Sequence, residues 1–326
     1  MKRKLSVIIL NWNGERLLRE FLPSVVRNTS GDEVEVIVAD NGSTDDSLRV
    51  LREEFPGVRT IVFDNNYGFS GGYNRAIREV DSEFVVLLNS DVSTPEGWWQ
   101  PLLRFMEDNP DVGACQPKIM SYREPEMFEY AGAAGGLLDS LGYPYCRGRL
   151  FDRIEKDCGQ YDDGPAEIAW ASGAALTVRR DAYLATGGLD ELFFAHMEEI
   201  DLCCRMHNAG YRVCVVPESK VYHLGGASLA QGNPKKTYLN FRNNLLLLHK
   251  NLPRRRGRKV LFRRRLMDTL AFFMFVAKLD FGNARAVLKA HGDFRKMRSH
   301  YTSLPERDIL STLPGAERTI VFDRYL

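Results

Sequence analysis

The sequence has no cysteine framework and no long apolar run. Its six cysteines show no CxxC spacing, which argues against a zinc ribbon and a disulfide scaffold. The apolar run over residues 5–10 is too short for a signal-peptide core, and Asn11-Trp12-Asn13-Gly14 follows it in place of a small-residue cleavage site. We therefore expect a cytoplasmic protein with reduced thiols, whose residues 5–10 form a first strand.

The common glycine-rich phosphate motifs are also missing. There is no GxxxxGK[ST], which argues against a P-loop kinase. The glycines of Gly68-Phe69-Ser70-Gly71-Gly72 do not follow the GxGxxG pattern, and they come after the third predicted strand instead of the first. A helix that starts there still offers free backbone N–H groups to a phosphate.

Positive charge is concentrated in one segment. The 326 residues carry a formal net charge of +1, yet residues 250–265 contain nine Lys or Arg and no Asp or Glu. The rest of the chain is therefore net acidic. The hydrophobic fraction of 44% and the charged fraction of 27% suit a globular protein with a sizeable core, as one large domain or two small ones.

Strands and helices alternate in the first part. The hydrophobic pattern predicts strands at 5–10, 34–39, 58–63 and 84–88, and helices at 15–28, after an N-cap at Ser43, near 73–80 and near 95–108. This alternation predicts an α/β fold with a mostly parallel sheet and right-handed crossovers.

The pattern changes after residue 120. Residues 121–165 lose their periodicity, which indicates loops and irregular strands over the sheet edge. A mixed strand at 168–178, a helix at 198–208, short strands at 211–216 and 220–223, and helices at 238–249, 260–278 and 284–296 follow.

Polar side chains end three of the predicted strands. They are Asn11 and Asn13, Asp40 and Asn41, and Asn89-Ser90-Asp91. Helix capping or turn formation explains each group taken alone. Because parallel strands end at one edge, where open α/β sheets bind ligands, the three together favour a nucleotide cleft.

Two further features carry possible chemistry. Glu198, Glu199 and Asp201 crowd a helix start, where one of them can act as a general base or all three can form an ordinary acidic first turn. His223 ends a short strand, as a structural histidine or as a ligand for manganese or a similar metal.

Seven motifs in order carry a resemblance. They are residues 7–14, 38–45, 66–74, 87–92, 172–174, 187–191 and 198–202, read as VIILNWNG, VADNGSTD, NYGFSGGYN, LLNSDV, SGA, GGLDE and EEIDL. Over about residues 5–250 the chain resembles the inverting family-two glycosyltransferases with the GT-A fold, especially bacterial rhamnosyltransferase-like members.

The resemblance implies a donor site and a metal site. Asp40 would contact the nucleotide base, and Asp91, the last carboxylate of the family's DxD motif, would bind Mg²⁺ or Mn²⁺ together with His223. Asn89 replaces the first acidic residue of that motif, which weakens the site unless the diphosphate supplies ligands. The donor-site residues that we expect are Asn11, Asn13, Asp40, Asn41, Gly68, Asn74, Asn89 and Ser90.

The resemblance also implies a base and an acceptor site. Glu199 stands where the family usually has its catalytic base, often an aspartate, and the longer arm keeps Glu198 and Asp201 open as alternatives. We expect Trp170, Ser172 and Gly173 at the acceptor, although Trp170 fits a core position equally well.

The C-terminal segment is basic and rich in aromatic residues. Its apolar stretch, Leu266–Val276, is interrupted by Asp268 and is shorter than the roughly 20 residues that cross a bilayer. A helix of this kind fits an anionic membrane surface. A solvated charged face, with Phe272 and Phe275 packed on the domain, is the alternative, and no nucleic-acid module is present.

These observations predict a metal-dependent glycosyltransferase at the inner face of the cytoplasmic membrane. It would move a sugar to a glycan or lipid-linked acceptor in surface polysaccharide synthesis. The resemblance alone makes dTDP-rhamnose the leading donor, and a UDP-sugar stays open. We expect a catalytic domain at 1–250, with a nucleotide half at 1–120 and an acceptor half at 121–250, and a helical extension at 251–326. A nucleotidyltransferase and a non-catalytic glycan- or membrane-binding module are the alternatives.

Overall fold

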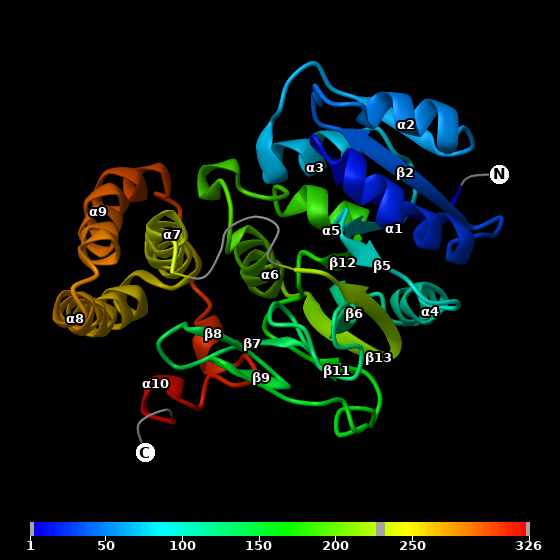
Figure 1. Ribbon diagram of the computed structural model, residues 1–326. Helices are drawn as coiled ribbons and strands as arrows, with labels where there is room; N and C mark the ends of the chain where they lie inside the picture. The colour runs from blue at the N-terminus through cyan, green and yellow to red at the C-terminus, as the bar shows by residue number, and fades with distance from the viewer. Residues whose placement is uncertain (1–2, 226–231, 324–326) are drawn as a thin grey trace.

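The computed structural model describes residues 3–225 and 232–323 and is built around one large mixed sheet (Figure 1). The strands of this sheet are β1 (Leu5–Asn11), β2 (Val34–Asp40), β3 (Arg59–Val62), β4 (Phe84–Leu88), β5 (Val92–Ser93), β6 (Val112–Ser121), β11 (Ala166–Glu167), β12 (Ala175–Arg179) and β13 (Arg212–His223). Their order is β11-β13-β6-β12-β4-β1-β2-β3, and β5 pairs with β13.

Most of the long pairings are parallel. Strand β1 runs parallel to β2 and β4, β2 runs parallel to β3, and β6 runs parallel to β13. Strand β12 is antiparallel to both of its neighbours, β4 and β6. The predicted α/β fold with a mostly parallel sheet is confirmed.

Helices cover both faces of the sheet. One face carries α1 (Glu15–Asn28), α2 (Ser47–Glu54) and α4 (Gln100–Asp108), and the other carries α3 (Gly68–Arg78), α5 (Arg180–Ala185) and α6 (Glu198–Asn208). Strand β1 shows why, because alternate side chains point to opposite faces. Val7 packs in the cluster that contains Leu18 of α1, whereas Ile8 packs with Ile77 of α3.

A small antiparallel sheet occupies the region predicted to be irregular. Its strands are β7 (Gly136–Leu138), β8 (Pro144–Cys146), β9 (Arg149–Leu150) and β10 (Arg153–Ile154), in the order β10-β9-β8-β7. Each strand is short, so the region lacks the long alternation that predicts a strand.

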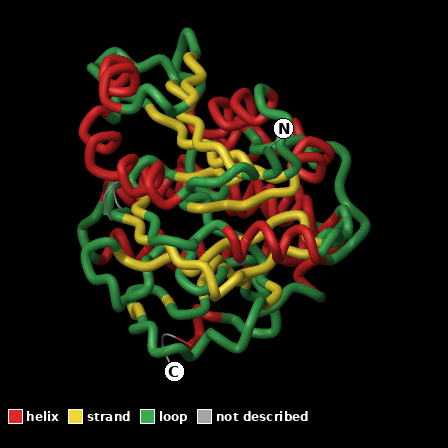
Figure 2. Tube along the Cα trace, turned by 90° about the vertical axis from the view of Figure 1, so that its right-hand side faces the viewer, coloured by secondary structure: helices red, strands yellow, loops and turns green. Residues whose placement is uncertain are grey.

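The C-terminal helices pack together beside the sheet. They are α7 (Pro234–Asn251), α8 (Arg254–Ala277) and α9 (Phe281–Met297), and the short α10 (Ile320–Asp323) follows. Single-turn 3₁₀ helices lie at Glu191–Phe193, Arg298–His300 and Ile309–Ser311. Figure 1 shows α7 between α6 on one side and α8 and α9 on the other, and Figure 2 gives the view at 90°. The boundary expected after residue 250 falls in the last turn of α7.

Several predicted boundaries were wrong. The helix expected after Ser43 begins at Ser47. The Ser43 hydroxyl does not cap it, because this hydroxyl accepts a hydrogen bond from the backbone N–H of Asn13 at 2.9 Å. Helix α3 begins at Gly68 and includes the glycine run. Gly72 lets this helix lie close to β1, since a Cβ there would lie 2.6 Å from Leu10 Cδ1 and the leucine side chain would have to move. Of the predicted strand at 168–178, only the residues from Ala175 onward belong to β12, and Trp170 forms an isolated bridge to Gly136. The predicted strands at 211–216 and 220–223 are one irregular strand, β13.

Candidate active site

The ends of β1 and β2 meet at the carboxyl edge of the sheet. Asn11 lies opposite Asp40 in the register, and both side chains are fully buried. The Asn11 amide donates to Asp40 Oδ2 at 2.9 Å, and the Ser43 backbone N–H donates to Asp40 Oδ1, also at 2.9 Å. Asn11 Oδ1 is buried and has no hydrogen-bond partner among the described residues.

Side-chain amides join the loops that follow β1, β2 and β3. Asn13 Oδ1 accepts from the Thr44 N–H at 2.7 Å. Asn41 Oδ1 accepts from the Tyr67 N–H at 3.0 Å, and its amide donates to the Gly68 carbonyl at 3.1 Å. These bonds cross between loops, so this edge is organised before any ligand binds.

The second part of the edge combines β4 and β13. Asp91 follows β4, and His223 is the last residue of β13. His223 Nε2 lies 3.1 Å from Asp91 Oδ1 and 3.4 Å from the Asn89 amide, and His223 Nδ1 lies 3.5 Å from Glu129 Oε2. Ser90, between Asn89 and Asp91, is half-buried at the same edge.

The charges of this group depend on one another. Burial lowers the pKa of His223, but Asp91 and Glu129 outweigh burial and raise it to about 10. Burial raises the pKa of Asp91, but the hydrogen bond and the charge of His223 outweigh that effect, and the pKa lies below its ordinary value. The imidazole of His223 thus lies between two carboxylates that favour its charged form.

The donor set of this group fits part of a metal site. A carboxylate and an imidazole suit Mg²⁺ or Mn²⁺, and the carboxylate of Glu129 can orient the imidazole from behind. In residues 3–225 and 232–323, no group of three His, Cys, Asp or Glu is placed to hold a metal alone. An ion at Asp91 and His223 therefore needs oxygen ligands from a bound molecule, and it must displace the proton of His223.

The acidic start of α6 separates its three carboxylates. Asp201 is fully buried and accepts from Arg205 Nε, Lys250 Nζ and Asn251 Nδ2, each at 2.8 Å. Its charge is neutralised by groups that hold it in place. The predicted alternative role of Asp201 as the base is therefore not supported by its surroundings.

Glu198 and Glu199 are in the opposite situation. One oxygen of each, Oε2, is buried and lacks a hydrogen-bond partner in the part of the chain that the structure describes, as does His196 Nε2. Burial raises the pKa of both carboxyls, and for Glu198 the neighbouring charge of Glu199 raises it further. Buried polar atoms without partners are rare in folded proteins, and each calls for a partner such as water, an ion or a ligand.

An unusual loop leads into α6. Phe194, His196 and Met197 have φ values of 67°, 67° and 75°, in the left-handed region that costs about 1–3 kcal/mol for each such residue. Asn243 of α7 holds this loop, because its amide donates to the carbonyls of Ala195 at 2.8 Å and His196 at 2.7 Å.

The turn before β12 connects these groups. A Cβ on Gly173 would lie 3.8 Å from Glu199 Cβ and 3.6 Å from Phe69 Cζ at the start of α3. The next residue, Ala174, accepts from the Asn89 N–H at 3.0 Å. The structure therefore brings the acidic pair, the glycine-rich helix start and the end of β4 together.

Other predicted site residues have structural partners. The Asn74 amide donates to the Leu189 carbonyl at 2.8 Å, and Asn74 Oδ1 accepts from the Tyr183 hydroxyl at 2.6 Å. The Ser172 hydroxyl donates to the Ala131 carbonyl at 2.7 Å. Asn74 and Ser172 hold neighbouring loops in place.

The predicted acceptor role of Trp170 is not supported by its position. Its side chain is 4% exposed, and its indole N–H donates to the Leu137 carbonyl at 2.9 Å. Any Cβ at Gly136 would collide with the indole ring. Trp170 is a core residue under the small sheet.

Sequence reasoning missed Glu129, Asn243 and Lys250. Each acts on a segment far away in the sequence, as Lys250 does by joining Asp190 at 2.6 Å to Asp201. The only signal in the sequence is a polar residue within an apolar helix pattern, such as Asn243 before Leu245–Leu248.

Comparisons with known proteins agree with this geometry. A family model described as glycosyl transferase family 2 matches residues 6–147. The N-acetylglucosaminyl-diphospho-decaprenol L-rhamnosyltransferase of Mycobacterium tuberculosis is 30% identical over 237 residues, which cover 67% of this chain and 75% of the relative. The chain belongs to glycosyl transferase family 2. It is a glycosyltransferase that takes its sugar from a nucleotide sugar, which removes the nucleotidyltransferase alternative.

Two more distant likenesses agree. Rhamnosyltransferase WbbL of Escherichia coli K12 is 22% identical, over 67% of this chain and 82% of the relative. The crystal structure of GalNAc-T7 with UDP, GalNAc and Mn²⁺ matches with a TM-score of 0.63 at 15% identity, over 96% of this chain and 58% of that chain. The likeness confirms the predicted GT-A type of fold.

The Asn243 contacts predict a loss of turnover without a loss of donor binding. In Asn243→Ala the loop before Glu198 loses its amide donors, and displacement of a catalytic group by about 1 Å can cost about 100-fold in rate. Steady-state kinetics should therefore show a fall in kcat of that order with little change in the KM for the donor.

Asn244→Ala is the matched control. Asn244 is also buried, but its amide donates to the Gly142 carbonyl, away from the loop. Both variants should lose about 1–3 kcal/mol of unfolding free energy, measured by urea denaturation. Equal kcat values in the two variants would contradict the positioning role.

Proposed function

We propose that this glycosyltransferase moves rhamnose from a nucleotide diphosphate to a lipid-linked glycan, with inversion at the anomeric carbon. One observation carries the proposal of a catalytic site. The atoms Nε2 of His196 and Oε2 of Glu198 and Glu199 are buried without hydrogen-bond partners among the described residues, and Glu199 lies beside the turn at Gly173. A sugar hydroxyl is a group that would fill such a gap.

In this proposal Glu199 is the general base. Its carboxylate takes the proton of an acceptor hydroxyl, the oxygen attacks the anomeric carbon, and the bond from that carbon to the diphosphate oxygen breaks on the opposite face. The nucleoside diphosphate leaves with the bonding electrons. The half-buried Glu199 suits this role better than Glu198, which is only 6% exposed.

Glu198 would then be the protonated member of the pair. Two adjacent buried carboxylates do not both ionise readily, and burial and the charge of Glu199 raise the pKa of Glu198 well above its ordinary value. A protonated Glu198 can donate a hydrogen bond beside the base without adding a second negative charge.

The donor is proposed to lie along the carboxyl edge of the sheet. Asp40 and the loops tied by Asn13 and Asn41 would receive the nucleoside, while Asp91 and His223 would hold Mg²⁺ or Mn²⁺ against the diphosphate. Such a metal neutralises charge on a leaving diphosphate. The names of the Mycobacterium tuberculosis and Escherichia coli relatives support rhamnose, and the UDP in the GalNAc-T7 structure keeps UDP-sugars open.

The proposed acceptor is a glycan on a lipid diphosphate, as the name of the Mycobacterium tuberculosis relative suggests. Helix α8 supports a membrane location at the inner face of the cytoplasmic membrane. Phe262, Leu266, Leu270 and Phe273 share one helix face, and each is more than half exposed. Among the described residues, no helix has the length and apolar character needed to cross a bilayer.

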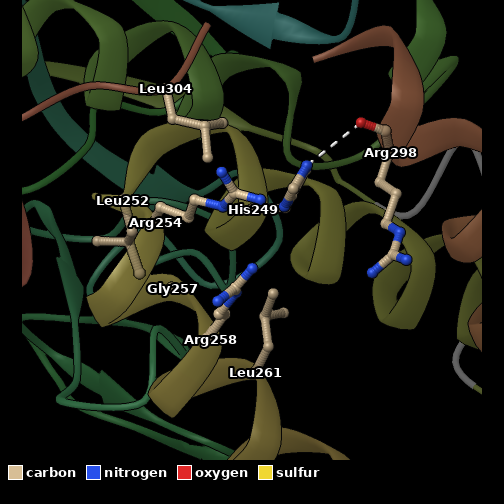
Figure 3. A pocket seen from close by; sticks show the side chains of 8 residues that line it. All are labelled: His249, Leu252, Arg254, Gly257, Arg258, Leu261, Arg298 and Leu304. Atoms are coloured by element: carbon tan, nitrogen blue, oxygen red, sulfur yellow. Dashed lines mark hydrogen bonds between the residues drawn. The ribbon is translucent and has the colours of Figure 1, made fainter. Parts of the chain in front are cut away.

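Cations flank this apolar face. Arg255, Lys259 and Arg263 of α8 form no ion pair with the described residues. A pocket of about 240 Å³ at the start of α8 is lined by His249 and three arginines, Arg254, Arg258 and Arg298 (Figure 3). An apolar stripe with unpaired cations fits a surface of anionic lipid.

Asp91→Asn should weaken metal-dependent binding of the donor nucleotide. The substitution removes the carboxylate from the pair with His223, and we expect a loss of at least about tenfold in affinity. Calorimetric titration of dTDP and UDP with Mn²⁺ and with EDTA measures the effect. An affinity that is unchanged with Mn²⁺ would remove Asp91 from the metal site.

Glu199→Gln should abolish transfer and leave nucleotide binding intact. Loss of a general base costs about 10²–10⁴ in rate. Glu198→Gln is the matched control and should retain most activity, because glutamine resembles the protonated glutamate. The reverse result would make Glu198 the base, and a wild-type protein without transfer would favour a non-catalytic module.

The pH profile of the wild-type enzyme checks the same assignment. The base must be ionised, and the pKa of Glu199 is raised by burial, so activity should be lost as pH falls through a value above the usual 4.3 of a glutamate. The acidic limb of kcat/KM should persist in Glu198→Gln. A limb at or below pH 4.3 would contradict a buried base.

The double variant Phe262→Ser and Phe273→Ser should lose binding to phosphatidylglycerol vesicles. Each phenylalanine contributes about 1.5 kcal/mol or more when buried, so vesicle co-sedimentation should fall at least about tenfold. Val62→Ser changes an exposed apolar residue on edge strand β3 and is the control. Equal binding of all three proteins would place the membrane contact elsewhere.

A further inference from the structure

A groove between α7 and α9 reaches the loop that carries the acidic pair. Its volume is about 510 Å³, and its lining includes the aromatic residues Phe194 and Tyr238 and the cations Lys235, Arg242, Arg285 and Lys289. No Asp or Glu is among the residues that line it. The groove thus combines apolar and aromatic side chains with four cations and no carboxylate.

Three of these cations have no counter-charge. Lys235, Arg285 and Lys289 are exposed and form no ion pair with any residue in the described ranges. Two of them lie near aromatic rings, with Lys235 Nζ 5.3 Å from the Phe194 ring and Lys289 Nζ 4.8 Å from the Tyr238 ring. Like charges that gather without a counter-ion favour an anionic ligand.

The fourth cation connects the groove to the catalytic loop. Arg242 is buried, and its Nη2 donates to the Phe193 carbonyl at 2.8 Å. Phe194, the next residue, lines the groove, and the chain from Phe194 to Glu199 can extend no more than about 19 Å between Cα atoms. The groove therefore adjoins the loop that leads to Glu199.

Two exposed apolar residues of α9 adjoin the lining residues in the sequence. Phe281 and Leu288 are 62% and 59% exposed, and they lie one helix position before Gly282 and Lys289 of the lining. Both belong to the helical unit whose α8 face carries the apolar stripe. An acyl or isoprenoid chain can therefore run from the groove toward a membrane.

We propose that this groove binds the diphosphate of the lipid-linked acceptor, with the lipid chain along Phe281 and Leu288. The inference rests on the proposed function for the identity of the acceptor. It separates two diphosphate sites in one molecule: the donor diphosphate at Asp91 and the acceptor diphosphate at Arg285 and Lys289. The acceptor sugar then projects from the groove along the loop toward Glu199.

The test uses the full chain and farnesyl diphosphate as the probe. Its affinity is measured by calorimetry in EDTA, below the concentration at which the probe forms micelles. The double variant Arg285→Gln and Lys289→Gln should bind at least tenfold more weakly than wild type. Arg295→Gln with Lys296→Gln removes two exposed cations of the same helix outside the groove and should bind as wild type does.

Other results would overturn the proposal. It fails if wild type does not bind the probe, if the Arg285 and Lys289 variant binds normally, or if excess UDP displaces the probe, which would place the probe in the donor cleft. It also fails if inorganic pyrophosphate binds as tightly as the probe, since the cations would then bind anions in general. It fails as well if the Arg285 and Lys289 variant loses as much binding to phosphatidylglycerol vesicles as to farnesyl diphosphate, since the cations would then contact the membrane surface in general.

A separate measurement of nucleotide binding distinguishes a failure of this inference from a failure of the proposed function. Both double variants should bind dTDP or UDP with Mn²⁺ as wild type does. Failure of wild type to bind any nucleotide would count against the proposed donor site, while the result with farnesyl diphosphate would still decide the groove.

Discussion

The ion-pair network around Asp201 determines where the acidic pair can lie. Asp201 is fully buried between Arg205 of its own helix and Lys250 and Asn251 of α7, and Lys250 also holds Asp190. Loss of one partner from such a buried network costs about 3–5 kcal/mol, because a charge is left uncompensated. With Asp201 neutralised by these groups, Oε2 of each glutamate at the start of α6 is left without a hydrogen-bond partner among the described residues.

The two sides of the active site are built differently. On the donor side, side-chain amides bond one loop to the next, and the backbone between them is relaxed except at Asn13 and at glycines. On the acceptor side, consecutive left-handed residues are held by Asn243 from a neighbouring helix. The donor edge is therefore formed by local sequence, whereas the position of the base depends on a distant helix.

This difference explains what the sequence could predict. Strands at 5–11 and 84–88 have long apolar runs, so their positions and the polar residues after them follow from the pattern. Strand β6 was missed because it contains Gly113 and Pro117 and buries the polar Gln116 and Lys118, which conceal its strand character. Asn74 and Trp170 were assigned to binding because nothing local shows that distant carbonyls satisfy them. Whether the remaining donor and metal residues bind ligand stays a prediction.

The apolar face of α8 also affects how the protein behaves in water. A contiguous row of exposed phenylalanine and leucine side chains is unusual for a monomer in aqueous solution, and such rows promote self-association. The arginines between them oppose that tendency at low ionic strength, and salt screens this repulsion. Concentrated samples at high salt would therefore form assemblies through α8, and mild detergent would return them to single chains.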